Sequence, residues 1–286
     1  MNLEQRARAH AALGEPVRLA IVDELVLGDA APGELSARFG LATNLLAFHL
    51  RVLDDAGLVR RVRSEGDRRR QYVQLRLDDP AVAALTRPAH GPASAAIGGE
   101  GVPEQVVFVC TANSARSQLA AAAWRRVSAL PVASAGTHPA ARVHPRAVAA
   151  ARRHGLDLTG ATPTALPGLP GPGLPGSLGV LGAADGDPGG EPRSDGGPLV
   201  VAVCDNAHEE LARGLHVQDL PGPTDHQGPG GRGGPARRWL HWHVPDPVRV
   251  DTDEAFEAAY AQITERVDRL AAALDPTRNS DLPVAS

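Results

Sequence analysis

The chain has 286 residues, with 29 basic residues against 33 acidic ones and a formal net charge of −4. This length suffices for two domains with separate cores, and the charge excludes a uniformly basic nucleic-acid binder while allowing a local basic face. Two cysteines, no signal-peptide pattern and no apolar run near the ~18 residues of a membrane span predict a cytoplasmic protein that does not enter a membrane.

The first sixty residues contain helix signals in close succession. An apolar stripe at helical spacing, with Pro16 near its start, predicts a helix over residues 13–22. A second helix is expected over residues 32–39, closed by Gly40, and a third runs from Thr43 toward Gly57. Helix, short turn, helix is the geometry that places the second helix of the pair in the major groove of DNA.

An arginine-rich hairpin follows these helices. Residues 58–63 and 68–75 flank a turn at residues 65–67, and their alternating faces predict two antiparallel strands. Residues 59–76 hold seven Arg and two acidic side chains, which suits contact with DNA phosphates. A solvated hairpin on a protein-interaction domain is the alternative.

This half resembles the ArsR-type winged-helix repressors, whose recognition helix commonly carries a small residue, any residue, then His-Leu, here Ala47-Phe48-His49-Leu50. The resemblance implies operator DNA as a partner and a homodimer, because such domains bind palindromic half-sites. It implies DNA contacts through the third helix and the hairpin, from Thr43, Asn44, Phe48, His49, Arg51, Arg61, Arg63, Arg68, Arg69 and Arg70.

The inducer of this half is not evident from its residues. Residues 1–100 contain no Cys, which excludes thiolate capture of arsenite by this domain. Asp78, Asp79 and His90 are more typical of a solvated surface, so no metal site is predicted. If the protein senses a ligand, we expect the signal to come from the thiols of the second half.

Composition sets the expected domain boundaries. A winged helix-turn-helix domain over residues 1–85 is followed by a flexible linker over 86–103, a second domain over 104–275 and a disordered tail over 276–286. Within the second domain, residues 166–198 hold eighteen Gly or Pro and residues 220–235 hold ten, which predicts mobile insertions.

The second domain opens with a candidate oxyanion cradle. The apolar run 106–109 predicts a buried strand that ends at Cys110, followed by a small-residue loop and an Ala-rich helix beginning near Arg116. Backbone N–H groups of such a loop can surround a tetrahedral anion while an Arg clamps its oxygens, and this field favours the thiolate. Cys110 is therefore the predicted nucleophile, Arg116 the clamp and Ser117 a support for the thiolate. The loop consists of Thr111, Ala112, Asn113, Ser114 and Ala115. An inert buried Cys is the alternative.

Residues 105–274 resemble the low-molecular-weight protein tyrosine phosphatases, and more closely their arsenate reductase branch. The motifs that carry the likeness are the cradle, Ser134-Ala135-Gly136-Thr137, His144-Pro145-Arg146-Ala147-Val148, the run 199–204 and the segment 241–247. The resemblance implies an α/β three-layer domain with a central four-stranded parallel sheet. The fold class expected for the whole chain is thus a winged helix-turn-helix domain followed by such an α/β domain.

The resemblance also implies roles for two further residues. Asp246, before Pro247, corresponds to the general acid of the family, although it could simply cap the following loop. Cys204 corresponds to the thiol that attacks a Cys–arsenate adduct, although it could be a buried core residue. The resemblance implies no bound cofactor and an external thiol reductant, either thioredoxin or a mycothiol/redoxin system.

Two departures from the family pattern bear on this chemistry. Thioredoxin-linked relatives carry another cysteine where this chain has Leu211, and many hold a loop cysteine where it has Ala115. A three-thiol relay is thus excluded. Phosphotyrosine enzymes of the family place aromatic residues after the Asp-Pro pair, whereas this chain has Val248-Arg249-Val250. Arsenate reduction is therefore favoured, and a phosphatase or a non-enzymatic oxyanion- or redox-sensing repressor are the alternatives.

A final helix is expected to begin near Asp251, with Glu254 three residues on in a capping-box arrangement. One stripe of this helix is apolar and predicts core packing rather than a cofactor site. The stripe consists of Phe256, Tyr260, Ile263, Val267, Leu270 and Leu274.

Overall fold

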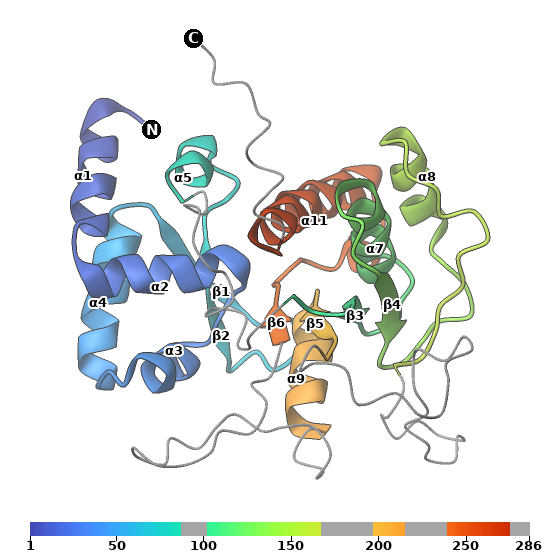
Figure 1. The fold of residues 1–286 in the computed structure, drawn as a ribbon, viewed down its shortest axis with the longest axis horizontal. Helices are drawn as coiled ribbons and strands as arrows, with labels where there is room; N and C mark the ends of the chain where they lie inside the picture. The colour runs from blue at the N-terminus through green and yellow to red at the C-terminus, as the bar shows by residue number, and fades with distance from the viewer. Residues whose placement is uncertain (87–101, 167–196, 215–238, 275–286) are drawn as a thin grey trace.

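The computed structural model describes residues 1–86, 102–166, 197–214 and 239–274 (Figure 1). The predicted tail and most of the predicted linker and of both Gly/Pro-rich insertions lie outside these residues. In the described part no helix is long and apolar enough to cross a bilayer.

The N-terminal domain consists of helices packed against a two-stranded hairpin. Its elements are α1 (Leu3–Leu13), α2 (Pro16–Leu27), α3 (Pro32–Phe39), α4 (Thr43–Asp55), β1 (Val59–Arg63), β2 (Gln71–Leu75) and α5 (Pro80–Leu85). The Glu15 carboxylate caps α2 by accepting from the N–H groups of Val17 and Arg18. Gly40 ends α3 in the left-handed conformation, φ 61°, which favours glycine. The predicted pair α3–α4 and the antiparallel hairpin are both confirmed, whereas α1 and α5 were not predicted.

The second domain is built on a parallel sheet of order β4-β3-β5-β6. Its elements are β3 (Val106–Cys110), α7 (Arg116–Val127), β4 (Val132–Gly136), α8 (Pro145–Arg153), β5 (Leu199–Ala202), α9 (Asp205–Gly214), β6 (Trp239–His241), α10 (Pro247–Val250) and α11 (Asp253–Leu274). Helices α7 and α11 pack together on one face of the sheet, and α9 lies on the other (Figure 1). The four-stranded parallel sheet and the three layers confirm the predicted fold class.

The last helix begins at Asp253, close to the expected start near Asp251. Asp251 has φ 54° and ends α10 in the left-handed conformation, so it cannot open α11. The Thr252 hydroxyl instead accepts from the N–H of Ala255, and α11 begins at Asp253. The apolar stripe of this helix packs in the core as expected, with Leu274 partly buried at its end.

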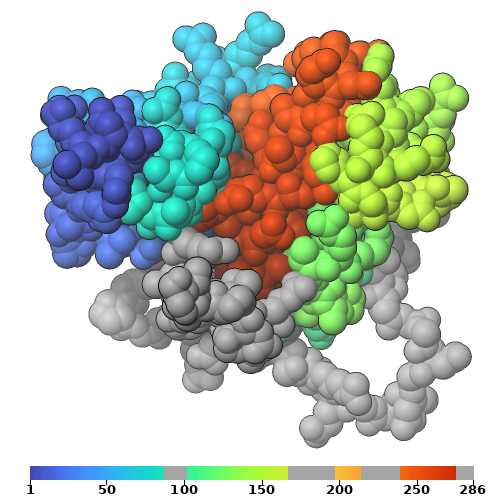
Figure 2. All heavy atoms as spheres, turned by 90° about the horizontal axis from the view of Figure 1, so that it is seen from above, coloured from blue at the N-terminus to red at the C-terminus, as the bar shows by residue number. Residues whose placement is uncertain are grey.

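The two domains share a buried interface, which differs from the expected pair of loosely tethered halves. Arg266 of α11 donates to both carboxylate oxygens of Asp29 at 2.9 Å, and both side chains are almost fully buried. The same carboxylate accepts from the backbone N–H of His243 at 2.6 Å, and the Trp242 indole donates to the Leu27 carbonyl at 2.7 Å. Helix α11 lies between the N-terminal helices and α8 in Figure 2. Composition identified a linker, but it carried no information about these long-range contacts.

Candidate functional site

The Cys110 thiol lies at the carboxyl end of β3 and faces hydrogen-bond donors. Its sulfur accepts from the backbone N–H of Asn113 at 3.2 Å and lies 3.0 Å from the Ser117 hydroxyl. Asn113 adopts φ 47°, a left-handed conformation that Asn tolerates better than most residues other than Gly, where the loop turns. The thiol is nearly fully buried. Ser117 therefore lies beside the predicted nucleophile, and its role in supporting a thiolate stays a prediction.

The Asn113 side chain ties the loop together. Its amide donates to the Ser117 hydroxyl at 2.8 Å, and its oxygen accepts from Gln118 Nε2 at 3.0 Å and from the N–H of Thr164 at 2.8 Å. Gly136, at the end of β4, lies so close that a Cβ there would meet the Thr111 carbonyl at 2.7 Å. The loop is therefore fixed by its neighbours rather than left free.

Backbone hydrogen bonds also fix which way the loop faces. The segment after β4 donates to the loop carbonyls of residues 110, 111, 112 and 114 from the N–H groups of Thr137, His138, Ala140 and His144, over 2.8–3.1 Å. Because these carbonyls are occupied on one side, the loop can present N–H groups toward the Cys110 side. Ala115 precedes Arg116, the first residue of α7, so the helix N-terminus also points at this site.

Arg116 joins the cradle to the segment after β6. Its guanidinium lies 3.3 Å from Asp246 Oδ1, donates to the Val244 carbonyl at 2.9 Å and lies 3.5 Å from Glu65 Oε2. Burial alone would lower the pKa of Arg116, but the negative groups of Cys204, Asp246, Cys110 and Glu65 raise it above its ordinary value. The guanidinium is therefore permanently charged at the site.

Asp246 both caps the following helix and lies beside the cradle, the two alternatives considered from the sequence. Its Oδ1 accepts from the N–H of Val248 at 3.2 Å, so it caps α10. The same carboxylate faces Arg116, and about a quarter of the side chain is exposed, 23%. Capping and a place at the cradle are compatible here.

Cys204 follows β5, the strand beside β3, and its thiol approaches the loop that follows Cys110. Its sulfur lies 3.6 Å from the Thr111 hydroxyl and 3.5 Å from the N–H of Ala207. Burial raises the pKa of the Cys204 thiol, against the opposing pull of Arg116, and Cys110 adds to the increase. The two sulfurs are both free thiols that share the field of one guanidinium.

Sequence reasoning missed a cluster of polar residues beside Cys204. The Asp205 carboxylate lies 2.9 Å from His241 Nε2 and 2.8 Å from His243 Nδ1. Burial opposes ionisation of Asp205, but the hydrogen bonds from the two imidazoles outweigh it and hold the pKa below its ordinary range. The repeated His at 241 and 243, on either side of Trp242, was the only local sign of this cluster.

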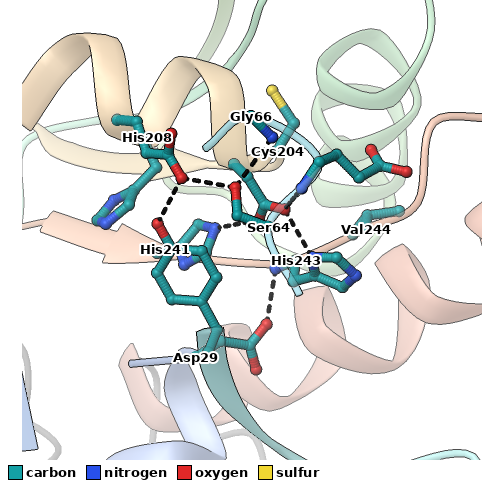
Figure 3. A network of polar contacts seen from close by, with 12 residues as sticks. Asp29, Ser64, Gly66, Cys204, His208, His241, His243 and Val244 are labelled. Atoms are coloured by element: carbon teal, nitrogen blue, oxygen red, sulfur yellow. Dashed lines mark hydrogen bonds and ion pairs between the residues drawn. The ribbon is translucent and has the colours of Figure 1, made fainter. Parts of the chain in front are cut away.

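The hairpin turn of the N-terminal domain reaches into this cluster. Ser64 and Tyr72 donate to Glu209 of α9 at 2.6 and 3.1 Å, and Figure 3 shows Ser64 lying among residues of the second domain. Burial and the nearby Glu209 carboxylate raise the pKa of Tyr72, so its hydroxyl stays protonated and donates. No signal in the turn sequence indicated this role.

Most side chains predicted to contact DNA lie on the surface. Phe48 of α4 is 46% exposed, and the Arg51 guanidinium lies 5.7 Å from its ring. His49 is different: it is 7% exposed and its Nδ1 lies 3.5 Å from Glu15, so its placement does not fit a DNA contact. Its place in the helix period, one residue after Phe48, turns it to the core. The other predicted DNA-contacting residues are exposed: Thr43, Asn44, Arg51, Arg61, Arg63, Arg68, Arg69 and Arg70.

Within the described ranges no group of three or more His, Cys, Asp or Glu side chains has a metal-binding arrangement.

Comparisons with known proteins support both halves of this architecture. The model for low molecular weight phosphotyrosine protein phosphatase matches residues 105–167, and a helix-turn-helix domain model matches residues 13–62. No curated protein matches significantly. The chain thus joins a helix-turn-helix DNA-binding domain to a low-molecular-weight-phosphatase-like domain.

Solved structures that are similar to this chain belong to proteins with several different activities. The tyrosine phosphatase Wzb from Escherichia coli K30 is 17% identical, with 60% of this chain and 99% of that chain covered and a TM-score of 0.39. The arsenate reductase from Archaeoglobus fulgidus is 23% identical, with 58% and 98% covered and a TM-score of 0.35. The YwlE arginine phosphatase from Geobacillus stearothermophilus is 17% identical, with 64% and 100% covered and a TM-score of 0.40.

Proposed function

We propose that this protein is a transcriptional regulator fused to a thiol-dependent arsenate reductase. The observation that carries the proposal is the second free thiol, Cys204, whose sulfur lies 3.6 Å from Thr111 of the Cys110 loop and which interacts electrostatically with Arg116 as Cys110 does. A phosphatase of this fold requires one nucleophilic thiol, whereas reduction of arsenate by two electrons consumes two. Cys204 therefore favours the redox reaction.

The first step forms a bond between sulfur and arsenic. The Cys110 thiolate attacks arsenate while Arg116 and the loop N–H groups hold its oxygens. One As–O bond breaks, and Asp246 supplies the proton with which that oxygen leaves as water. Arsenic remains in its pentavalent state in this adduct.

The second step reduces arsenic. The Cys204 thiolate attacks Cys110 Sγ, a Cys110–Cys204 disulfide forms and the S–As bond breaks with its electron pair left on arsenic. Arsenite is released, and the two thiols have supplied the two electrons. A small thiol such as mycothiol could instead attack the adduct and leave a mixed disulfide.

The remaining partners follow from the same proposal. A thioredoxin or a mycothiol/redoxin system would restore the thiols, because the protein carries neither a third cysteine nor a bound cofactor in this scheme. The exposed arginines of the hairpin and the exposed face of α4 would bind operator DNA, as a homodimer on a palindromic site.

The test is arsenite release from arsenate by the full chain, assayed with thioredoxin and, separately, with mycothiol and its redoxin. We expect turnover with one of the two systems and loss of roughly three to six orders of magnitude in Cys110→Ser. The system that works identifies the electron donor. Absence of arsenite in both systems, with reductants shown to be active on another substrate, would refute the reductase.

A phosphatase is the second candidate, favoured by the contact between Asp246 and Arg116. Phosphoryl transfer needs only Cys110, Arg116 and an acid. Hydrolysis of p-nitrophenyl phosphate that survives Cys204→Ser, together with no arsenate reduction, would establish this activity instead.

A further inference from the structure

The turn of the DNA-binding hairpin places a carboxylate in the candidate catalytic site. Both oxygens of Glu65 accept from the backbone N–H of Asp246, at 3.2 and 3.1 Å. Glu65 Oε2 also lies 3.5 Å from Arg116 Nη1. The predicted general acid and the predicted anion clamp thus both contact one residue of the other domain.

The turn is anchored to the second domain independently of this carboxylate. Asp205 accepts from the N–H of Glu65 at 2.7 Å, and Glu209 accepts from the N–H of Asp67 at 2.9 Å. At Gly66, a Cβ would lie 2.6 Å from Asn206 Oδ1 and 2.7 Å from Glu209 Oε2. A side chain at this position would have to displace these two side-chain oxygens of α9. These backbone hydrogen bonds therefore hold the turn, and with it the Glu65 carboxylate, beside the site.

We propose that Glu65 is a positioning residue of the oxyanion site, supplied by the DNA-binding domain, and that its carboxylate competes with the bound oxyanion for Arg116. Of the proposed function, this inference requires only that the cradle binds an oxyanion. It requires no redox chemistry.

The competition follows from charge. A tetrahedral dianion in the cradle places two further negative charges beside a guanidinium that already faces Glu65 and Asp246. Like charges at such a site repel, and the low dielectric of a buried site strengthens the repulsion. Oxyanion binding therefore weakens the hold of Arg116 and the Asp246 N–H on the turn. By linkage, a ligand that pulls the turn away strengthens oxyanion binding by the same factor.

This linkage connects the two domains. Arg63 ends β1 and Arg68 lies in the segment before β2; both side chains are exposed and are expected to contact DNA phosphates. DNA that moves the hairpin also moves Glu65, so cradle occupancy and DNA affinity depend on one another through this carboxylate.

Calorimetric titration of the full chain with inorganic phosphate tests the competition. Glu65→Gln keeps the size of the side chain and an acceptor for the Asp246 N–H but removes the charge. We expect it to bind phosphate more tightly, by roughly five- to a hundredfold, the usual range of coupling between sites. Asp78→Asn is the matched control, because Asp78 is a carboxylate of the same domain that pairs with Arg60 on the surface. It should leave phosphate affinity unchanged.

Hydrogen exchange of the turn gives the second readout. Phosphate should accelerate exchange of the Glu65 and Asp67 amides, which donate to Asp205 and Glu209, in the wild type and far less in Glu65→Gln. A purely structural role for Glu65 predicts weaker phosphate binding in the variant, and that result would overturn the proposal. Equal affinity in both proteins with no change in exchange would also overturn it while leaving the cradle intact. No phosphate binding to either protein would reject the oxyanion site itself.

Discussion

Cys110 and Cys204 lie at the carboxyl ends of the neighbouring strands β3 and β5, but the residues around the two sulfurs differ. After β3 the backbone turns at Asn113, and donors from Asn113 and Ser117 face the Cys110 sulfur. After β5 the chain enters α9 directly, so Cys204 is followed by the acidic Asp205, and burial raises the pKa of its thiol. The two cysteines therefore differ in their surroundings: the Cys110 sulfur faces hydrogen-bond donors, whereas burial favours the protonated form of the Cys204 thiol.

The variant Cys204→Ser tests most directly whether the two cysteines have different roles in the reaction. We expect Cys204→Ser to leave formation of the Cys110 adduct intact and to slow arsenite release by at least roughly a thousandfold without added thiol, because an intramolecular nucleophile is lost. Rapid-quench single-turnover assays measure the arsenite, and mass spectrometry of quenched samples detects the adduct. Equal release from variant and wild type would mean that Cys204 is a core residue only.

Removing the Ser117 hydroxyl takes a hydrogen-bond partner from the Cys110 sulfur and an acceptor from the Asn113 amide. The 3.0 Å contact to the sulfur is a hydrogen bond to a charged group once the thiolate forms, and such bonds contribute about 1.5–3 kcal/mol. Ser117→Ala should therefore slow alkylation of Cys110 by iodoacetamide at pH 7 by roughly ten- to a hundredfold. Ser114→Ala, which removes a hydroxyl from the same loop, is the control, and a similar slowing there would point to general loosening of the loop.

The raised pKa of Cys204 predicts a pH dependence for the second step. Burial favours the protonated thiol, so the thiolate fraction is small at neutral pH and increases about tenfold per pH unit up to the raised pKa. Arsenite release in single turnover should therefore keep accelerating above pH ~8.5, where an ordinary thiol levels off. In Cys204→Ser with added mercaptoethanol the profile should follow the free thiol instead. A plateau near neutral pH in the wild type would contradict this account.

The sequence predicted the surroundings of Cys110 far better than those of Cys204. The cradle is local: strand, thiol, small residues, Arg116 and Ser117 lie within one short segment, so spacing and residue type suffice. Cys204 precedes Asp205, whose carboxylate lies against His241, His243 and the backbone N–H of Glu65, all of which are distant in sequence. No periodicity connects Glu65 with Asp246, because their contact depends on how two domains pack.

The smallest expected effect concerns the contact between the two domains at Asp205, and it is measured as a change in the free energy of unfolding. Asp205 accepts from two imidazoles and from the N–H of Glu65, so Asp205→Asn leaves partners of a buried carboxylate without a full acceptor. We expect the free energy of unfolding in urea to fall by about 1–3 kcal/mol, with Asp78→Asn unchanged within about 0.5 kcal/mol.

This loss of stability should depend on pH. The pKa of Asp205 is depressed in the folded state, so the stability that its carboxylate contributes is present above the ordinary range of an Asp carboxyl near pH 4 and is lost as the pH falls through the depressed value. The difference between wild type and Asp205→Asn should therefore narrow below pH 4; an Asn variant as stable as the wild type at pH 7 would mean that the hairpin turn does not depend on this carboxylate.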